Sequence, residues 1–334
     1  MPFFIVDEDI TEMNVDAVVN AANTDLRMGS GVCGAIFRAA GREAMEEACS
    51  RFRPVKTGEA VITPGFELPA RYVIHTPGPV YQEQKAAWCE EQLRASYRNS
   101  LHLAEQYHCE SLAFPLISSG AYGYPKEEAL QVAVSEIRKF LETHELAVYL
   151  TLFTEVEIMP LREQRDMEWY LAEQYTGDEP AFHHGAVYGA LPDMDFSEGK
   201  CILPEIGAPA AGIPEALSEQ LDEPFNKALL HLIDAKGKTD VEVYKKANIS
   251  RKLFSKIRTG RGYMPGKRTI LALAIGLELN MEETENLLEH AGFALSQSIL
   301  SDVIVKYFIS HKKYDIYEIN DALFHYQQPL LGSA

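Results

Sequence analysis

Two loops rich in small residues carry the clearest chemical signal in this 334-residue chain. Each follows a β-rich run and leads into a helical pattern. Glycine lets the backbone approach a ligand closely, and a helix N-terminus offers unpaired N–H donors with a partial positive charge. Either loop alone could be an ordinary tight turn, but two at the ends of neighbouring strands would hold a diphosphate between them. The residues concerned are Gly29, Ser30, Gly31 and Val32 in the first loop and Ser118, Ser119, Gly120, Ala121 and Tyr122 in the second.

The elements that position these loops alternate between strand and helix. Short runs rich in Val, Ile, Phe and Tyr predict strands, and apolar residues at three- and four-residue spacing predict helices between them. A last amphipathic stretch, 161–175, is expected to pack against the sheet. This alternation predicts an α/β domain over residues 1–175, with a largely parallel sheet covered by helices on both faces. The predicted strands are 3–7, 15–21, 60–66, 72–76, 111–117 and 148–153, and the predicted helices are 32–51, 86–106 and 126–142.

Five stretches of residues 1–155 extend the pattern: VDAVVNAAN, GSGVCGAIFRAAG, KTGEAVIT, YVIHTPGP and ISSGAYGYP. In their order and spacing they resemble the macrodomain family, and most closely its MacroD-type ADP-ribosyl hydrolases of the Appr-1"-p processing type. The resemblance implies a three-layer α/β/α sandwich with a mostly parallel mixed sheet. It also implies that ADP-ribose, free or attached to a macromolecule, binds in a cleft at the strand ends.

The resemblance also implies roles for individual residues. Asp9 would accept a hydrogen bond from the adenine amino group, with Ile10 beside it, or would instead cap the strand end. Asn23, preceded by Ala22, would reach the distal ribose, whereas Asn20 would tie the loop to the sheet. The backbone of 29–32 and of 118–122 would hold the diphosphate, with Tyr122 closing over the ribose or simply packing. Phe153 is the candidate for covering the adenine.

One departure from the family bears on catalysis. Cys33 stands where MacroD-type hydrolases carry an aspartate, and Ser30 and Phe37 replace a glycine and a histidine. Hydrolysis needs a base or another way to orient water, and a neutral thiol is a poor substitute. Asn23 and Cys33 are therefore the candidate catalytic residues of the alternative in which the domain is an active hydrolase, acting on ADP-ribosylated macromolecules, on O-acetyl-ADP-ribose or on a phosphate ester of ADP-ribose. A thiolate at Cys33 and a merely small residue there are the two interpretations of the cysteine.

The remaining sequence predicts a linker and a second domain. Residues 176–220 are acidic and rich in Gly, Pro and Ala, which predicts a flexible linker. Residues 221–334 predict an all-α domain, with helices at 223–235, 241–246, 251–258, 268–277, 282–290, 298–310 and 316–326. The last two could complete the helical core or form a homodimer seam.

Helix-turn-helix spacing around residues 239–260 resembles the phage-repressor-like DNA-binding fold. Residues 243–277 contain nine Lys or Arg and no Asp or Glu. DNA is therefore a predicted partner, with a protein-binding helical domain as the alternative. A DNA-binding regulator with a vestigial nucleotide pocket is a further hypothesis. The predicted DNA-contacting residues are Ser250, Arg251, Lys252, Ser255, Lys256, Arg258 and Arg261.

Composition narrows the remaining options. A net charge of -18 argues against general nucleic-acid affinity of the whole chain. Five scattered cysteines show no zinc-ligand spacing, so neither a disulfide framework nor a metal site is predicted, and no cofactor is expected besides the ligand ADP-ribose. The absence of a long apolar run and of a secretory signal predicts a cytoplasmic protein with no membrane partner.

Overall fold

The computed structural model describes residues 2–152, 161–176, 224–260 and 263–332. The chain divides into two compact units. The first, called the sheet unit, comprises residues 1–163, 320–325 and 333–334, and the second, called the helical unit, comprises 164–319 and 326–332. The predicted linker from residue 177 onward, Phe153 and Arg261 lie outside the described residues.

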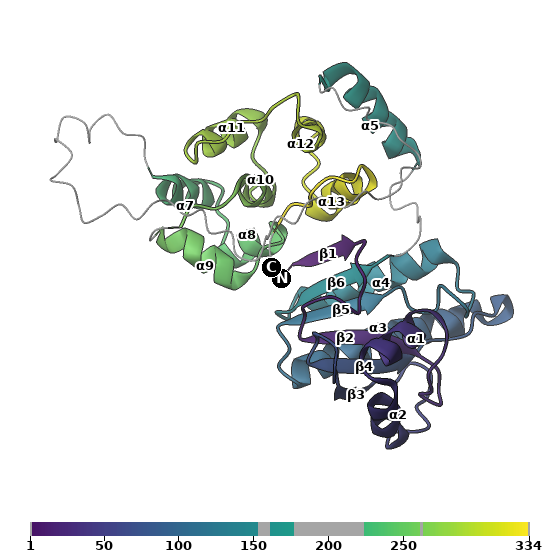
Figure 1. The fold of residues 1–334 in the computed structure, drawn as a ribbon. Helices are drawn as coiled ribbons and strands as arrows, with labels where there is room; N and C mark the ends of the chain where they lie inside the picture. The colour runs from purple at the N-terminus through teal and green to yellow at the C-terminus, as the bar shows by residue number, and fades with distance from the viewer. Residues whose placement is uncertain (1, 153–160, 177–223, 261–262, 333–334) are drawn as a thin grey trace, which may run out of the picture. The chain divides into compact units, whose positions relative to one another are not determined.

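A six-stranded mixed sheet forms the centre of the sheet unit (Figure 1). The strand order is β1-β6-β5-β2-β4-β3, and every pair is parallel except β3 with β4. Ala17, Val18 and Val19 of β2 are all fully buried, as expected when both faces of a parallel sheet are covered. The strands are β1 Phe3–Val6, β2 Ala17–Ala22, β3 Val61–Pro64, β4 Tyr72–Pro77, β5 Ser111–Pro115 and β6 Ala147–Thr151.

Helices cover the two faces of this sheet. Helices α1 (Gly31–Ala39) and α2 (Arg42–Ser50) share one apolar core with Val18, Val73 and Ala113 of the sheet. Phe114 follows Ala113 and therefore faces the opposite side. There its ring lies 5.1 Å from that of Tyr97 in α3 (Ala86–Gln106), which follows the short 3-10 helix η1 (Glu83–Lys85). Helix α4 (Lys126–Leu141) packs against α3, so the predicted layered α/β architecture is present.

The helix predicted over 32–51 is wrong in one respect, because the chain forms two helices there. Gly41 separates them with φ +90°, a conformation that residues with a side chain rarely adopt. The apolar spacing continues across the break because Phe37 of α1 and Met45 of α2 are buried in the same core. Hydrophobic periodicity therefore did not reveal the turn.

The second unit is built from helices, as predicted, and one difference of detail emerges. The predicted helix 161–175 was expected against the sheet, yet the Tyr170 ring lies 5.1 Å from Tyr307 of α12, within the helical unit. No helix of the described residues is long and apolar enough to cross a membrane. The remaining helices of the chain, of which α5 and α13 fall partly in the sheet unit, are α5 Leu161–Gln174, α7 Phe225–Ala235, α8 Asp240–Lys246, α9 Arg251–Thr259, α10 Lys267–Gly276, α11 Met281–Glu289, α12 Leu300–Ser310 and α13 Ile316–His325.

A buried polar chain crosses the core of the sheet unit. Asn20 Nδ2 donates to His75 Nδ1 over 3.0 Å, so Nε2 of the ring carries the proton and donates to Thr63 Oγ1 over 2.9 Å. Complete burial lowers the pKa of His75 from its usual 6.5 to about 3. The imidazole is therefore neutral in the folded chain at physiological pH.

This buried histidine predicts acid sensitivity of the fold. Between pH 6.5 and about 3 the unfolded chain takes up a proton at His75 that the folded chain refuses, so the free energy of unfolding falls as the pH falls. The slope contributed by one such proton is about 1.4 kcal/mol per pH unit. Urea unfolding followed between about pH 7 and about pH 5 should show a shallower pH dependence for His75→Gln than for the wild type. Equal slopes for the two proteins would contradict this assignment.

Candidate functional site

Three loops meet at one edge of the sheet, where the parallel strands β5, β2 and β4 end. Because these strands are neighbours and run in the same direction, the segments that follow them leave the sheet together. The loop after β4 binds the loop after β5 through Tyr81 N–H, which donates to Tyr122 O over 2.9 Å. A Cβ on Gly78 would lie 2.2 Å from Ser118 Oγ, so the two loops pack in direct contact. The structure thus brings the predicted loops to one place.

The first loop leads from β2 into α1 and is braced by Asn23. Asn23 Nδ2 donates to Arg27 O over 2.8 Å, and Arg27 N–H donates to Asn23 Oδ1 over 3.1 Å. A Cβ on Gly34 would lie 2.5 Å from Gly29 O, so only glycine lets the loop lie against the first turn of α1. Asn23, which was predicted to reach the distal ribose, therefore stabilises the loop through both its amide nitrogen and its amide oxygen.

The N-terminus of α1 follows this loop and has no side-chain cap. Ser30 is the N-cap residue, yet its side chain makes no capping hydrogen bond, and no acidic residue stands in the first turn. Gly31 has φ +60°, and a Cβ there would meet no described atom within 4 Å. The helix start therefore keeps its partial positive charge uncompensated by a capping side chain, beside open space at Gly31.

The second loop, after β5, has the same openness at its tip. Ser118 adopts φ +66°, which is uncommon for a residue with a side chain, and Tyr124 N–H donates to its carbonyl over 3.0 Å. Added Cβ atoms on Gly120 and Gly123 would meet no described atom within 4 Å. Space around Gly31, Gly120 and Gly123 thus leaves room for a ligand at both loops.

Residues that the sequence analysis did not single out position the second loop. The hydroxyl of Tyr97, a fully buried residue of α3, accepts from Ile117 N–H over 3.1 Å and donates to Pro115 O over 3.4 Å. Tyr97 therefore fixes the backbone just before Ser118. No local signal marks Tyr97 in the sequence, because its position also fits the apolar stripe of α3. The close contact at Gly78 could have been predicted from the sequence, because this glycine follows a predicted strand.

Cys33 lies in the first turn of α1, buried against the first loop. Its Sγ lies 3.8 Å from Arg27 O and would lie 3.7 Å from a Cβ on Gly29. Burial raises the pKa of the thiol, and this effect outweighs the hydrogen bonds from Gly29 and Asn20 that favour the thiolate. Burial also raises the pKa of the Tyr122 phenol, and a charge on nearby Cys33 would raise it further. Both groups are therefore protonated at neutral pH.

Asp9 and Ile10 follow β1. Ile10 is buried, whereas Asp9 is exposed and uses Oδ1 to accept from Thr11 N–H over 2.9 Å and from Thr11 Oγ1 over 2.7 Å. The carboxylate thus caps the turn after β1, the alternative role considered for it in the sequence. Its role toward an adenine stays a prediction.

The helical unit displays most of the predicted DNA-contacting side chains on α9. Arg251, Ser255 and Lys256 are exposed, while Phe254 and Ile257 of the same helix are buried. Ser250 caps this helix by accepting from Leu253 N–H over 3.2 Å. The exposed predicted residues of α9 are Arg251, Lys252, Ser255, Lys256 and Arg258.

Acidic residues from outside the basic stretch offset part of its charge. Arg258 pairs with Asp240, and Lys246 pairs with Glu278 over 2.7 Å. Lys267 pairs with Asp302 over 2.5 Å. The stretch without acids in the sequence is therefore less basic in three dimensions.

The arrangement of the sheet unit suits an anion. Its donors are backbone amides from two glycine loops and a helix N-terminus, which bind negative oxygen atoms without requiring a lysine. Such a donor set cannot coordinate a metal ion, because amide N–H groups have no lone pair to offer.

Known proteins match the first half of the chain. The Macro domain family model matches residues 19–133. A macro domain-containing protein of Methanosarcina mazei is 50% identical over 152 residues, covering 45% of this chain and 80% of that protein. ADP-ribose glycohydrolase MACROD1 of Mus musculus is 48% identical over 136 residues, covering 41% of this chain and 42% of the mouse protein.

One solved structure and a further curated relative are also similar to part of this chain. The Oceanobacillus iheyensis macrodomain, solved with ADP, aligns with a TM-score of 0.43 and 38% identity, covering 51% of this chain and 91% of that one. A macro domain-containing protein of Lactiplantibacillus plantarum is 53% identical over 140 residues, covering 42% of this chain and 80% of that protein. The identity and coverage of the curated relatives show that this chain belongs to the macro domain family.

Proposed function

We propose that the macro domain of this chain binds ADP-ribose, free or attached to a macromolecule, and that the chain reads or senses ADP-ribosylation. The observation that carries the proposal is the pair of glycine loops after the adjacent strands β2 and β5. Open space around Gly31 and Gly120 and the uncapped start of α1 leave room for a diphosphate and supply its donors.

One buried polar atom of the second loop supports a ligand at this edge. Ser118 Oγ is one of five buried side-chain polar atoms among the described residues that have no hydrogen-bond partner. A buried polar group left unpaired is costly, and ligands or ordered waters usually complete it. The left-handed backbone at Ser118 adds strain of the kind that concentrates at ligand sites.

The activity for which the mouse relative is named supports the choice of nucleotide. That protein is an ADP-ribose glycohydrolase, and 136 residues align with this chain at 48% identity. A diphosphate held by amides, with a ribose on either side, is the part of ADP-ribose that both glycine loops would contact together.

Binding rather than hydrolysis is the activity that Cys33 favours. Burial keeps this thiol protonated, so it provides neither the base that activates water nor a thiolate nucleophile. Both ends of the Asn23 amide already bond the backbone of Arg27. The alternative, an active hydrolase that releases ADP-ribose from proteins or deacetylates O-acetyl-ADP-ribose, rests on the name of the mouse relative.

We further propose that the helical unit binds DNA through α9, coupling the nucleotide signal to an effector. The supporting observation is the split of this helix into an exposed basic face with Arg251 and Lys256 and a buried face with Phe254 and Ile257. A short α8, a turn through Asn248 with φ +53° and the Ser250 cap of α9 support this proposal, because a helix-turn-helix motif joins two helices by a short turn.

Filling the open space at the second loop should abolish nucleotide binding. Gly120→Val adds a side chain where no described atom lies within 4 Å and where the backbone is not left-handed, so the fold should be unaffected. Isothermal titration with ADP-ribose should show affinity lower by at least about tenfold, or about 1.4 kcal/mol. Gly266→Val, in equally open space in the helical unit, is the matched control and should bind like the wild type. Wild-type affinity in Gly120→Val would remove the second loop from the site.

Replacing Cys33 by aspartate should distinguish a protein that only binds ADP-ribose from one that removes ADP-ribose from proteins. The wild type should release no ADP-ribose from a protein modified on aspartate or glutamate, because a protonated thiol cannot activate water. Cys33→Asp should gain release, measured as free ADP-ribose over time. Release by the wild type at a comparable rate would instead establish the hydrolase alternative.

Charge reversal on α9 should weaken DNA binding. Arg251→Glu with Lys256→Glu should lower the affinity of the full chain for a duplex and flatten its dependence on salt, since fewer phosphates are neutralised. Fluorescence anisotropy over a salt series measures both. Lys139→Glu, an exposed base on α4, is the matched control. An unchanged salt slope in the α9 variant would favour the protein-binding alternative.

A further inference from the structure

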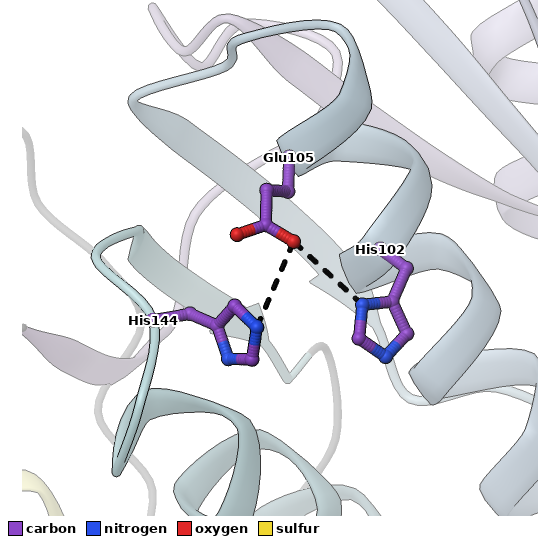
Figure 2. A group of neighbouring side chains, drawn as sticks. All are labelled: His102, Glu105 and His144. Carbon is purple, nitrogen blue, oxygen red and sulfur yellow. Dashed lines mark ion pairs between the residues drawn. The ribbon is translucent and has the colours of Figure 1, made fainter.

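We propose that His102, Glu105 and His144 bind a zinc ion at the edge of the sheet opposite to the glycine loops. Figure 2 shows the three side chains pointing toward one another, with the Glu105 carboxylate between the two imidazoles. His102 and Glu105 stand three residues apart in the last turns of α3 and so share one face of the helix. His144 follows α4, which packs against α3.

The separations of the three side chains fit ligands around one cation. Glu105 Oε2 lies 3.7 Å from His102 Nδ1 and 3.7 Å from His144 Nε2, and one ligand atom of each residue lies within 4.8 Å of the others. A charge-assisted hydrogen bond is shorter, about 2.8 Å. Ligands placed about 2.1 Å from a tetrahedral zinc ion lie about 3.4 Å from one another. Small side-chain rotations would therefore complete the site.

Neighbouring groups orient the His144 ring for metal binding. Its Nδ1 lies 3.0 Å from Phe140 O and 2.8 Å from Thr143 Oγ1. In the tautomer that donates from Nδ1 to the Phe140 carbonyl, the lone pair of Nε2 is directed toward Glu105. Metal-binding histidines commonly donate their other ring N–H to a backbone carbonyl in this way. The ring also stacks on Phe140 at a centroid distance of 4.1 Å and an angle of 7°, which fixes its plane.

The surroundings favour a positive ion. Helices α3 and α4 both end beside the cluster, and the partial negative charge of each C-terminus attracts a cation. Two imidazole nitrogens and one carboxylate form a ligand set that prefers zinc to magnesium or calcium. The half-exposed side chains leave the fourth coordination position to water. Bound zinc would clip the ends of α3 and α4 together.

This site is separate from the nucleotide site and does not rest on the proposed function. A crossover helix between parallel strands returns the chain to the edge where the next strand starts. Helix α3 leads from β4 to β5 and α4 leads from β5 to β6, so both helices end at the edge remote from the glycine loops.

Cobalt and zinc titrations of the full chain, first stripped with a chelator, test the site directly. Cobalt should give the visible absorption of tetrahedral coordination, and zinc should displace it. Glu105→Gln and His102→Ala should each lose one bound ion per chain, or bind it at least about tenfold more weakly. Zinc, but not magnesium, should raise the Tm of the wild type, because the ion binds only the folded chain.

His290→Ala is the matched control, since His290 Nδ1 also bonds the carbonyl four residues earlier, at 2.8 Å, but belongs to no metal-ligand group among the described residues. It should keep the wild-type count of bound ions. If the triad variants also keep that count, or if zinc leaves the wild-type Tm unchanged, the cluster consists of surface ion pairs and the proposal is wrong. Histidine ring nitrogen shifts in NMR spectra of the wild type decide the matter without any variant, because zinc should move His144 Nε2 and His102 Nδ1.

Discussion

Parallel pairing of β2 with both β4 and β5 is the constraint on which the rest of the sheet unit depends. Three strands running side by side in one direction release their loops at one edge and receive the crossover helices at the other. The crowding that results is relieved by glycine, at Gly34 against Gly29 O and at Gly78 against Ser118. Side chains larger than hydrogen at these two positions would push the loops apart.

Electrostatics explains how an acidic chain can present a site for an anion. The sheet unit supplies backbone dipoles at the glycine loops, and these need no cationic side chain. Cys33 stays uncharged beside them, because its thiol is buried and its pKa is raised. A carboxylate in that position would add a negative charge next to the proposed diphosphate site.

The sequence predicted the layered fold and the meeting of the two loops because both depend on local pattern. Strand and helix periodicity, together with glycines after strands, repeat every few residues and can be recognised without knowing the fold. The break at Gly41 escaped this logic, since α1 and α2 bury the same face. The use of Asn23 in turn bonds also escaped it, because a residue type does not say which nearby backbone group its side chain will bond.

Contacts between residues distant in sequence lay beyond prediction for a different reason. His144 comes 39 residues after Glu105, and only the packing of α4 on α3 brings the two together. Sequence motifs for metal sites place their ligands a few residues apart, so no such motif could have revealed this cluster. The same holds for Glu278 and Asp302, whose ion pairs offset the basic stretch of the helical unit.

The distance between the two edges of the sheet unit limits how a bound zinc ion could affect nucleotide binding. Helix α3 begins after the loop at Gly78, is 21 residues long and carries His102 and Glu105 near its C-terminal end. A helix of this length spans about 32 Å. An ion at its far end cannot touch a nucleotide held by the glycine loops. Its effect on binding would have to pass through the stability of α3, whose Tyr97 holds the backbone before Ser118. The zinc site is therefore structural in character, and the nucleotide site depends on it only as far as the loops depend on a well-ordered α3.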